Sequence, residues 1–263
     1  MSNKISEAFK RGKAFIPYIA CGDPDLETTK LIIEEMATSG ADLIELGIPF
    51  SDPTAEGPVI HQASLRALAS GATTDKIFEL VSGLNISTPL IFMTYANVVF
   101  SYGAEKFLSC CEELGIAGLI LPDVPYEESG EFKEICRAHG VDLISMIAPT
   151  SEQRIAKIAG DAEGFIYIVS SLGVTGVRSE ISTDIGAIVK TIRASSNKPC
   201  AVGFGISTPE QAEKMARYAD GVIVGSAIVK IIAEHGRDAV KPVGDYVRRM
   251  KEAVNIIISE KIS

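Results

Sequence analysis

Short apolar runs alternate with amphipathic segments along most of this chain. Eight runs have the length and the β-rich composition of strands, namely residues 15–20, 41–46, 90–94, 118–121, 142–147, 165–169, 200–203 and 221–224. Most of them are continuously hydrophobic and do not alternate with polar residues, which is the pattern of parallel strands covered on both faces. The hydrophobic pattern therefore predicts a parallel sheet with helices packed against it.

Amphipathic segments with helix start and stop signals separate these runs, for example residues 25–39, 104–114, 127–139, 183–194 and 208–218,. Strand and helix alternate eight times without a linker or a low-complexity stretch. This order favours a closed (β/α)8 barrel, or TIM barrel, over an open doubly wound sheet. We expect one domain covering residues 1–263, with an extra helix before the first strand because the N-terminal segment has helical spacing.

Composition narrows the classes of partner and compartment. The length of 263 residues fits one barrel, and the net charge of −9, without any run of Lys or Arg, argues against binding to nucleic acid or anionic membranes,. The five cysteines lack metal-ligand spacing, and their odd number suits a reducing compartment,. The cysteine spacing therefore predicts no metal site. Since the N-terminus also lacks the apolar core of a signal peptide, we expect a cytoplasmic protein.

Two intervals between predicted elements are long enough to carry chemistry. The second strand is followed by IPFSDPTAEGP, and the sixth is followed by SSLGVTGVRSE. In a (β/α)8 barrel the active site is built from the loops after the carboxyl ends of the strands. These two loops are therefore the first places to look for catalytic residues.

Two glutamates lie in the region of the second strand and its loop. Glu45 ends the apolar run ADLIEL, where its carboxyl would project into the barrel mouth, and Glu56 follows in the loop. Burial raises a carboxyl pKa toward neutrality, where the group can both donate and accept a proton. The alternatives are a structural salt bridge for Glu45 and a solvated surface position for Glu56. Asp52 in the same loop is equally suited to a turn.

Three glycine-bearing stretches follow the sixth, seventh and eighth strands, at residues 173–176, 203–205 and 225–226. Such loops leave backbone N–H groups free to surround a phosphate, and a helix that begins at Ser226 adds its positive end. No Ser/His/Asp or Cys/His arrangement can be assembled from the sequence. Acid/base chemistry on a small phosphorylated molecule is the reaction class that remains.

Seven strings along nearly the whole chain resemble one family, the α subunit of tryptophan synthase: PYIACGDPD, ELGIPFSDPTAEGP, MTYAN, LPDVPYEES, IYIVSSLGVTG, GFGISTPEQ and GVIVGSAIVK. The resemblance implies retro-aldol cleavage of indole-3-glycerol phosphate to indole and glyceraldehyde 3-phosphate, late in tryptophan biosynthesis. It also implies that indole passes to a β subunit in an αββα heterotetramer. The chain itself would need no cofactor, since pyridoxal phosphate would belong to the β partner.

The resemblance implies a role for each of several residues. Glu45 matches the catalytic glutamate of the family, Tyr167 a tyrosine beside it, and Thr175 a threonine of the loop after the sixth strand. Glu56 stands where the family usually has aspartate, and we expect it to contact the indole N–H nevertheless. Further matches are Gly176, Gly205, Gly225 and Ser226 at the phosphate, Tyr18, Met93, Tyr95 and Leu119 at the indole pocket, and Asp52 and Asn97 at the β-subunit interface.

Two other interpretations stay open at this point. The change at Glu56 is compatible with a non-catalytic chain that binds and activates the β subunit. A sugar-phosphate isomerase or epimerase built on another phosphate-binding barrel would share the late glycine loops and an acid at a strand end.

Overall fold

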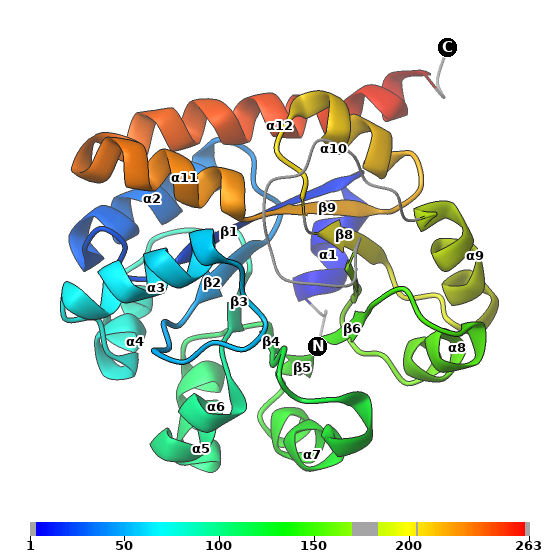
Figure 1. Ribbon diagram of the computed structural model, residues 1–263, viewed down its shortest axis with the longest axis horizontal. Coiled ribbons are helices and arrows are strands. Elements are labelled where there is room, and N and C mark those ends of the chain that lie inside the picture. The colour runs from blue at the N-terminus through cyan, green and yellow to red at the C-terminus, as the bar shows by residue number, and fades with distance from the viewer. Residues whose placement is uncertain (1–3, 170–183, 204, 261–263) are drawn as a thin grey trace.

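The computed structural model describes residues 4–169, 184–203 and 205–260, with side chains as far as residue 256. All its strands are parallel, and their order is β5-β4-β3-β2-β1-β9-β8-β7-β6. The strands are β1 (Ala14–Ala20), β2 (Ile44–Gly47), β3 (Leu90–Met93), β4 (Gly118–Ile120), β5 (Asp142–Leu143), β6 (Ser145–Ile147), β7 (Ile166–Val169), β8 (Cys200–Gly203) and β9 (Gly221–Val224). Figure 1 shows the helices arranged around this ring of strands.

The barrel closes through a strand that the sequence predicts as one piece. Residues 142–147 form β5 and β6 on either side of Ile144, and β5 pairs with β4 whereas β6 pairs with β7. The N–H of Ile144 still bonds to the carbonyl of Leu119 at 2.9 Å. One stretch of chain therefore bonds to both neighbours in turn, and the fold is the predicted eight-stranded barrel.

Helices cover the outside of the barrel, and the first helix lies within the ring of strands. In chain order they are α1 (Lys4–Lys10), α2 (Leu26–Thr38), α3 (Pro58–Ala69), α4 (Thr74–Ser82), α5 (Ala96–Tyr102), α6 (Ala104–Glu113), α7 (Gly130–Ala138), α8 (Glu152–Gly160), α9 (Ile185–Ser195), α10 (Pro209–Ala216), α11 (Ser226–His235) and α12 (Val240–Glu260), with short 3-10 turns at Tyr126–Glu128 and Gly236–Ala239. The predicted extra N-terminal helix is α1. Its Ile5 and Ala8 are buried with the residues inside the barrel, and Figure 1 shows α1 within the ring of strands. None of the described helices is long and apolar enough to cross a membrane.

The alternation of side chains along β2 directs Glu45 into the barrel. Leu43 belongs to the interior core, whereas Ile44 and Leu46 pack in the layer between strands and helices. Because successive side chains of a strand point to opposite faces, Glu45 shares the inner face with Leu43. The parallel register sets Glu45 beside Tyr18 of β1 and Ile91 of β3.

The loop after β2 is anchored at its far end by α3. Arg66 of α3 donates two hydrogen bonds to the carboxylate of Asp23, at 2.8 and 2.7 Å, and the hydroxyl of Ser70 donates to the carbonyl of Gly22 at 2.8 Å. Asp23 is buried, so this ion pair is partly shielded from water,. The helix that follows Glu56 is thereby tied to the loop after β1.

Candidate active site

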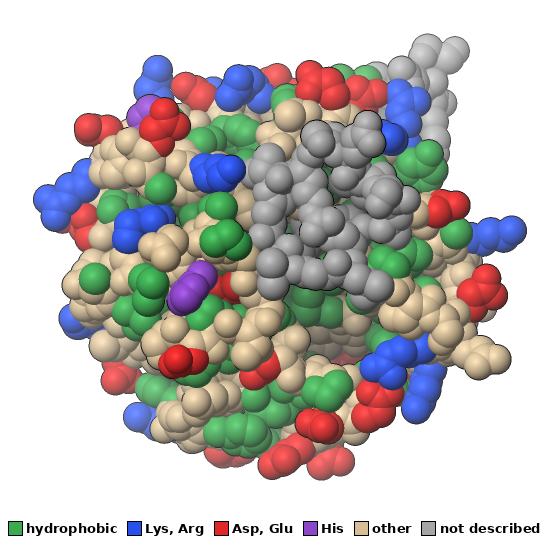
Figure 2. Space-filling view, in the orientation of Figure 1, with side chains coloured by type: hydrophobic (Ala, Val, Ile, Leu, Met, Phe, Trp, Pro, Cys, Tyr) green, Lys and Arg blue, Asp and Glu red, His purple; other side chains and the backbone are tan. Residues whose placement is uncertain are grey.

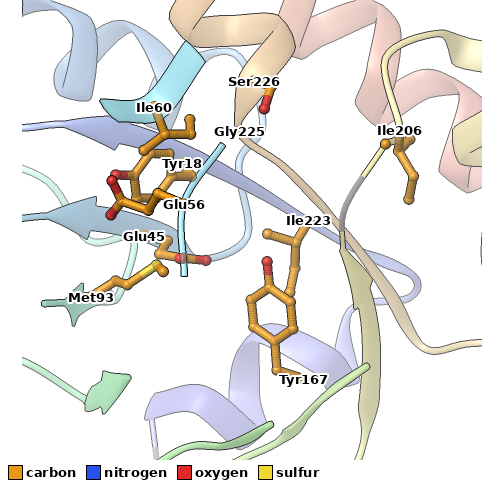
Figure 3. Close-up of a pocket in the computed structure, with 11 residues that line it drawn as sticks. Tyr18, Glu45, Glu56, Ile60, Met93, Tyr167, Ile206, Ile223, Gly225 and Ser226 are labelled. Carbon is orange, nitrogen blue, oxygen red and sulfur yellow. The ribbon is translucent and has the colours of Figure 1, made fainter. Parts of the chain in front are cut away.

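A cavity opens at the carboxyl ends of the strands, inside the barrel. Its lining comes from β1, β2, β3, β7, β9, the loops after β2 and β8, and the N-terminal ends of α3 and α11. The lining residues are Tyr18, Glu45, Glu56, Ile60, Met93, Tyr167, Gly205, Ile206, Ile223, Gly225 and Ser226. The sequence predicts eight of these eleven, and Figure 3 shows Glu45, Met93 and Tyr167 around one space.

Glu45 is a buried carboxyl that lacks a full set of hydrogen bonds. Only 1% of the residue is exposed, and its Oε2 has no hydrogen-bond partner among the described residues. Burial and, to a smaller extent, the nearby charge of Glu56 raise the pKa of Glu45 to about 8,. At neutral pH the group therefore holds a proton that it can deliver into the cavity.

Glu56 reaches the same cavity from the loop between β2 and α3. Burial raises the pKa of Glu56 to about 7, and a hydrogen bond with the Tyr95 hydroxyl opposes that rise. Its Oε2 also lacks a hydrogen-bond partner within the described part of the chain. Two carboxyls with different environments can divide the proton-donating and the anionic roles.

Two tyrosines complete the floor of the cavity, and each lies over a glycine of a neighbouring strand. A Cβ at Gly47 would lie 2.3 Å from the hydroxyl of Tyr18, and one at Gly203 would lie 2.4 Å from the hydroxyl of Tyr167. Burial raises the pKa of both phenols well above the ordinary value. They therefore stay neutral, and Figure 3 shows the Tyr167 hydroxyl and the Glu45 carboxyl directed into the same space.

Part of the cavity wall is formed by backbone. Ser226 begins α11, with Gly225 preceding it, and Gly205 adopts a φ of +79°, which favours glycine,. The first N–H groups of a helix have no partner within the helix, so this end can receive an anion. Of the residues expected here and beside the carboxyls, Gly176 and Thr175 lie outside the described residues.

Two of the residues expected at the indole pocket are not among those that line the cavity. Leu119 packs in the layer between strands and helices, and its neighbour Ile120 takes the inner face. Tyr95 does not line the cavity; its hydroxyl instead accepts the N–H of Ala55 at 3.2 Å. Leu119 and Tyr95 both lie at the level of the cavity along the barrel, but their side chains point elsewhere.

Three lining residues escape the prediction: Ile60, Ile206 and Ile223. Ile223 lies on the inner face of β9, so the alternation along that strand was a usable signal,. Ile60 comes from the first turn of α3 and Ile206 from the loop after β8. No local sequence pattern distinguishes their side chains from ordinary core residues.

The residues expected at a partner interface lie outside the cavity. Asp52 and Asn97 are both exposed, and Asn97 lies in the first turn of α5 close to Phe100, which is 51% exposed. Figure 2 shows hydrophobic side chains at the surface over α5 and its neighbours. Within the described ranges, no group of His, Cys, Asp and Glu side chains is arranged to hold a metal ion.

Comparison with known proteins gives consistent results at the level of sequence and of fold. The family model described as tryptophan synthase alpha chain matches residues 5–255. The tryptophan synthase alpha chain of Lacticaseibacillus casei is 47% identical over 257 residues, which is 97% of each chain.

Two solved structures extend the comparison. The tryptophan synthase subunit alpha of Legionella pneumophila superposes with a TM-score of 0.88 at 37% identity, covering 97% of this chain and 99% of that one. A tryptophan synthase complex from Pyrococcus furiosus gives 0.82 at 34% identity, over 91% and 98% of the two chains. With sequence, fold and cavity in agreement, the chain belongs to the tryptophan synthase alpha chain family.

Proposed function

We propose that this chain cleaves indole-3-glycerol phosphate to indole and glyceraldehyde 3-phosphate, with Glu45 as the acid/base and Glu56 as the anionic partner of the indole ring. The activity is that of the family to which the chain belongs. The observation that carries the assignment of residues is the pair of carboxyls in one cavity, Glu45 buried and Glu56 partly buried, with pKa values raised to about 8 and about 7.

The reaction needs a proton before the carbon–carbon bond can break, because an indole carbanion is a poor leaving group. Glu45, protonated at neutral pH, donates its proton to C3 of the ring. Its carboxylate then accepts the proton of the glycerol hydroxyl beside the breaking bond. The electron pair of that bond returns to the ring, so indole leaves and the aldehyde forms. Glu45 ends the cycle protonated, as it began.

Protonation at C3 places positive charge on the ring nitrogen. A carboxylate that accepts the indole N–H stabilises this charge more in the transition state than in the ground state. Glu56 is suited to that role because its pKa lies below that of Glu45. The apolar side chains of Met93, Ile60 and Ile223 offer contact surface for the ring between the carboxyls.

The phosphate of the substrate fits the part of the cavity wall that α11 and the loop after β8 form. The N-terminal end of α11 at Ser226, with Gly225 and Gly205, presents backbone N–H groups to a phosphate,. Holding the phosphate there fixes the glycerol carbons relative to Glu45, and such positioning lowers the barrier of the chemical step.

The expected partner is a tryptophan synthase β subunit, which would hold pyridoxal phosphate; this family of alpha chains needs no cofactor. The Pyrococcus furiosus structure is of a tryptophan synthase complex. We place the contact with the β subunit on the exposed surface around Asp52 and Asn97.

The direct test is to incubate the purified chain with indole-3-glycerol phosphate, alone and with a β subunit, and to measure indole release. The chain contains no tryptophan, so indole fluorescence can be followed without a protein indole background. We expect indole in both cases and a faster rate with the partner. Absence of indole in both cases would contradict the proposed function.

A further inference from the structure

Tyr95 contacts the loop that carries Glu56 at two points. The residue is 2% exposed and lies between β3 and α5. Its ring packs 5.3 Å, centroid to centroid, from the ring of Phe50 at the start of the loop. Its hydroxyl accepts the N–H of Ala55, the residue before Glu56. The loop is therefore held on both sides by one rigid side chain.

The chemistry of a phenol determines what the same hydroxyl does to Glu56. A neutral tyrosine has one O–H proton to donate and can accept hydrogen bonds at its oxygen. Since the oxygen accepts the Ala55 N–H, the proton remains available for the adjacent Glu56 carboxyl. Burial raises the pKa of Tyr95, so the phenol stays neutral and remains a donor.

Donation to a carboxyl favours its ionised form, because a carboxylate accepts a hydrogen bond more strongly than a carboxylic acid does. The Tyr95 hydroxyl lowers the pKa of Glu56 and so opposes the rise caused by burial. At Glu45, by contrast, burial and the charge of Glu56 both raise the pKa. The two carboxyls thus differ by one named hydrogen bond.

We propose that Tyr95 is a positioning residue that keeps Glu56 oriented and ionised, so that Glu56 serves as the anion and Glu45 as the acid. This inference rests on the proposed function for its catalytic meaning. Tyr95 is not among the residues that line the cavity. It acts through the Ala55 backbone and the Glu56 carboxyl.

The test compares Tyr95→Phe with a matched control, Tyr102→Phe. Tyr102 is the last residue of α5, the helix that Tyr95 precedes, and its hydroxyl donates a 2.6 Å hydrogen bond to Asp75. Tyr95→Phe removes the hydroxyl that accepts from Ala55 and donates to Glu56, and Tyr102→Phe removes the hydroxyl that donates to Asp75. Both variants keep the ring. Circular dichroism and thermal melting establish that both are folded.

The readout is the pH dependence of indole release. With Tyr95→Phe, the ascending limb that reports ionisation of Glu56 moves to higher pH by about one unit, and kcat at pH 7 falls about tenfold, in line with the loss of one hydrogen bond to a charged group. KM changes less than kcat, because the lost interaction matters most once the ring is charged. Tyr102→Phe keeps the profile of the wild type.

A second readout does not depend on activity. The carboxyl signal of Glu56 in ¹³C-glutamate-labelled protein, assigned from its loss in Glu56→Gln, is titrated in the wild type and in Tyr95→Phe. A higher midpoint in the variant supports the inference. An unchanged midpoint, or an activity loss that is equal at every pH, overturns it. Failure of the wild type to release indole would instead count against the proposed function, and the titration would still decide the role of Tyr95.

Discussion

Replacing Glu45 with glutamine should abolish turnover and at the same time stabilise the folded chain at alkaline pH. Glu45→Gln keeps the size of the side chain and removes its ability to ionise. The wild type must bury a carboxyl whose pKa is about 8 in the folded state, against an ordinary value of 4.5. The variant has no such group, so its stability has no contribution from this ionisation.

The size of the effect follows from linkage between protonation and folding. The two pKa values differ by about 3.5, and at about 1.4 kcal/mol for each pKa unit this corresponds to about 5 kcal/mol. The sign follows from the direction of the shift: the raised pKa gives stability that is fully present below pH 4.5 and is lost as the pH rises through 8. Part of the total comes from the charge of Glu56, the smaller of the two causes of the raised pKa.

The assay is urea unfolding at a series of pH values from 5 to 9, followed by far-ultraviolet circular dichroism. We expect the free energy of unfolding of the wild type to fall relative to that of Glu45→Gln by about 1.4 kcal/mol per pH unit between pH 5 and 8. A difference between the two proteins that is the same at pH 5.5 and pH 8.5 would refute the reasoning, because Glu45 would then ionise as easily in the folded state as in the unfolded one.

Three other outcomes are expected. Activity should peak between pH 7 and 8, where Glu56 is ionised and Glu45 is protonated, and Glu56→Gln should lower kcat by about 100-fold at that optimum, as measured by indole release,. Arg66→Met, which leaves buried Asp23 without its partner, should cost about 2 kcal/mol in urea unfolding, since the arginine is partly exposed; unchanged stability would contradict this,. His139, whose pKa is raised by hydrogen bonds to two glutamates of α6, contributes stability that is present below pH 6.5 and lost as the pH rises through its raised pKa. His139→Gln should therefore lower the melting temperature more at pH 6 than at pH 9, and an equal loss at both would count against it.

The barrel and the position of Glu45 could be predicted because each depends on a local pattern. Buried parallel strands read as apolar runs, and a glutamate at the end of such a run has few places to go other than the barrel mouth. The division of 142–147 into β5 and β6 could not be predicted, because it arises where the strand changes neighbours during closure. Sequence periodicity carries no information about that change.

The direction of the Leu119 side chain has a related physical cause. In a short strand that is apolar on both faces, as in Gly118–Ile120, hydrophobicity does not say which residue faces inward. The register with β3 decides it, since Leu119 lies beside the outward Phe92 and Ile120 beside the inward Met93. Pairing between strands, and not the strand itself, determines the face.

The contact between Tyr95 and the loop before Glu56 could not be predicted from the sequence, for another reason. Its hydroxyl meets Ala55, forty residues earlier in the chain, only after β2 and β3 have paired. A contact between residues so far apart in the chain leaves no local sequence pattern, so the bond between Tyr95 and the loop becomes visible only in the folded chain.

The central claim, that Glu45 is the acid/base of the reaction, is tested most directly by the kcat for indole release from indole-3-glycerol phosphate at pH 7.5 in the wild type and in Glu45→Gln. We expect the variant, folded and at least as stable as the wild type, to lose activity by 1,000-fold or more, on the order of the largest effects attributed to general acid/base catalysis. A variant that retains a tenth of the wild-type kcat or more would contradict the assignment of Glu45.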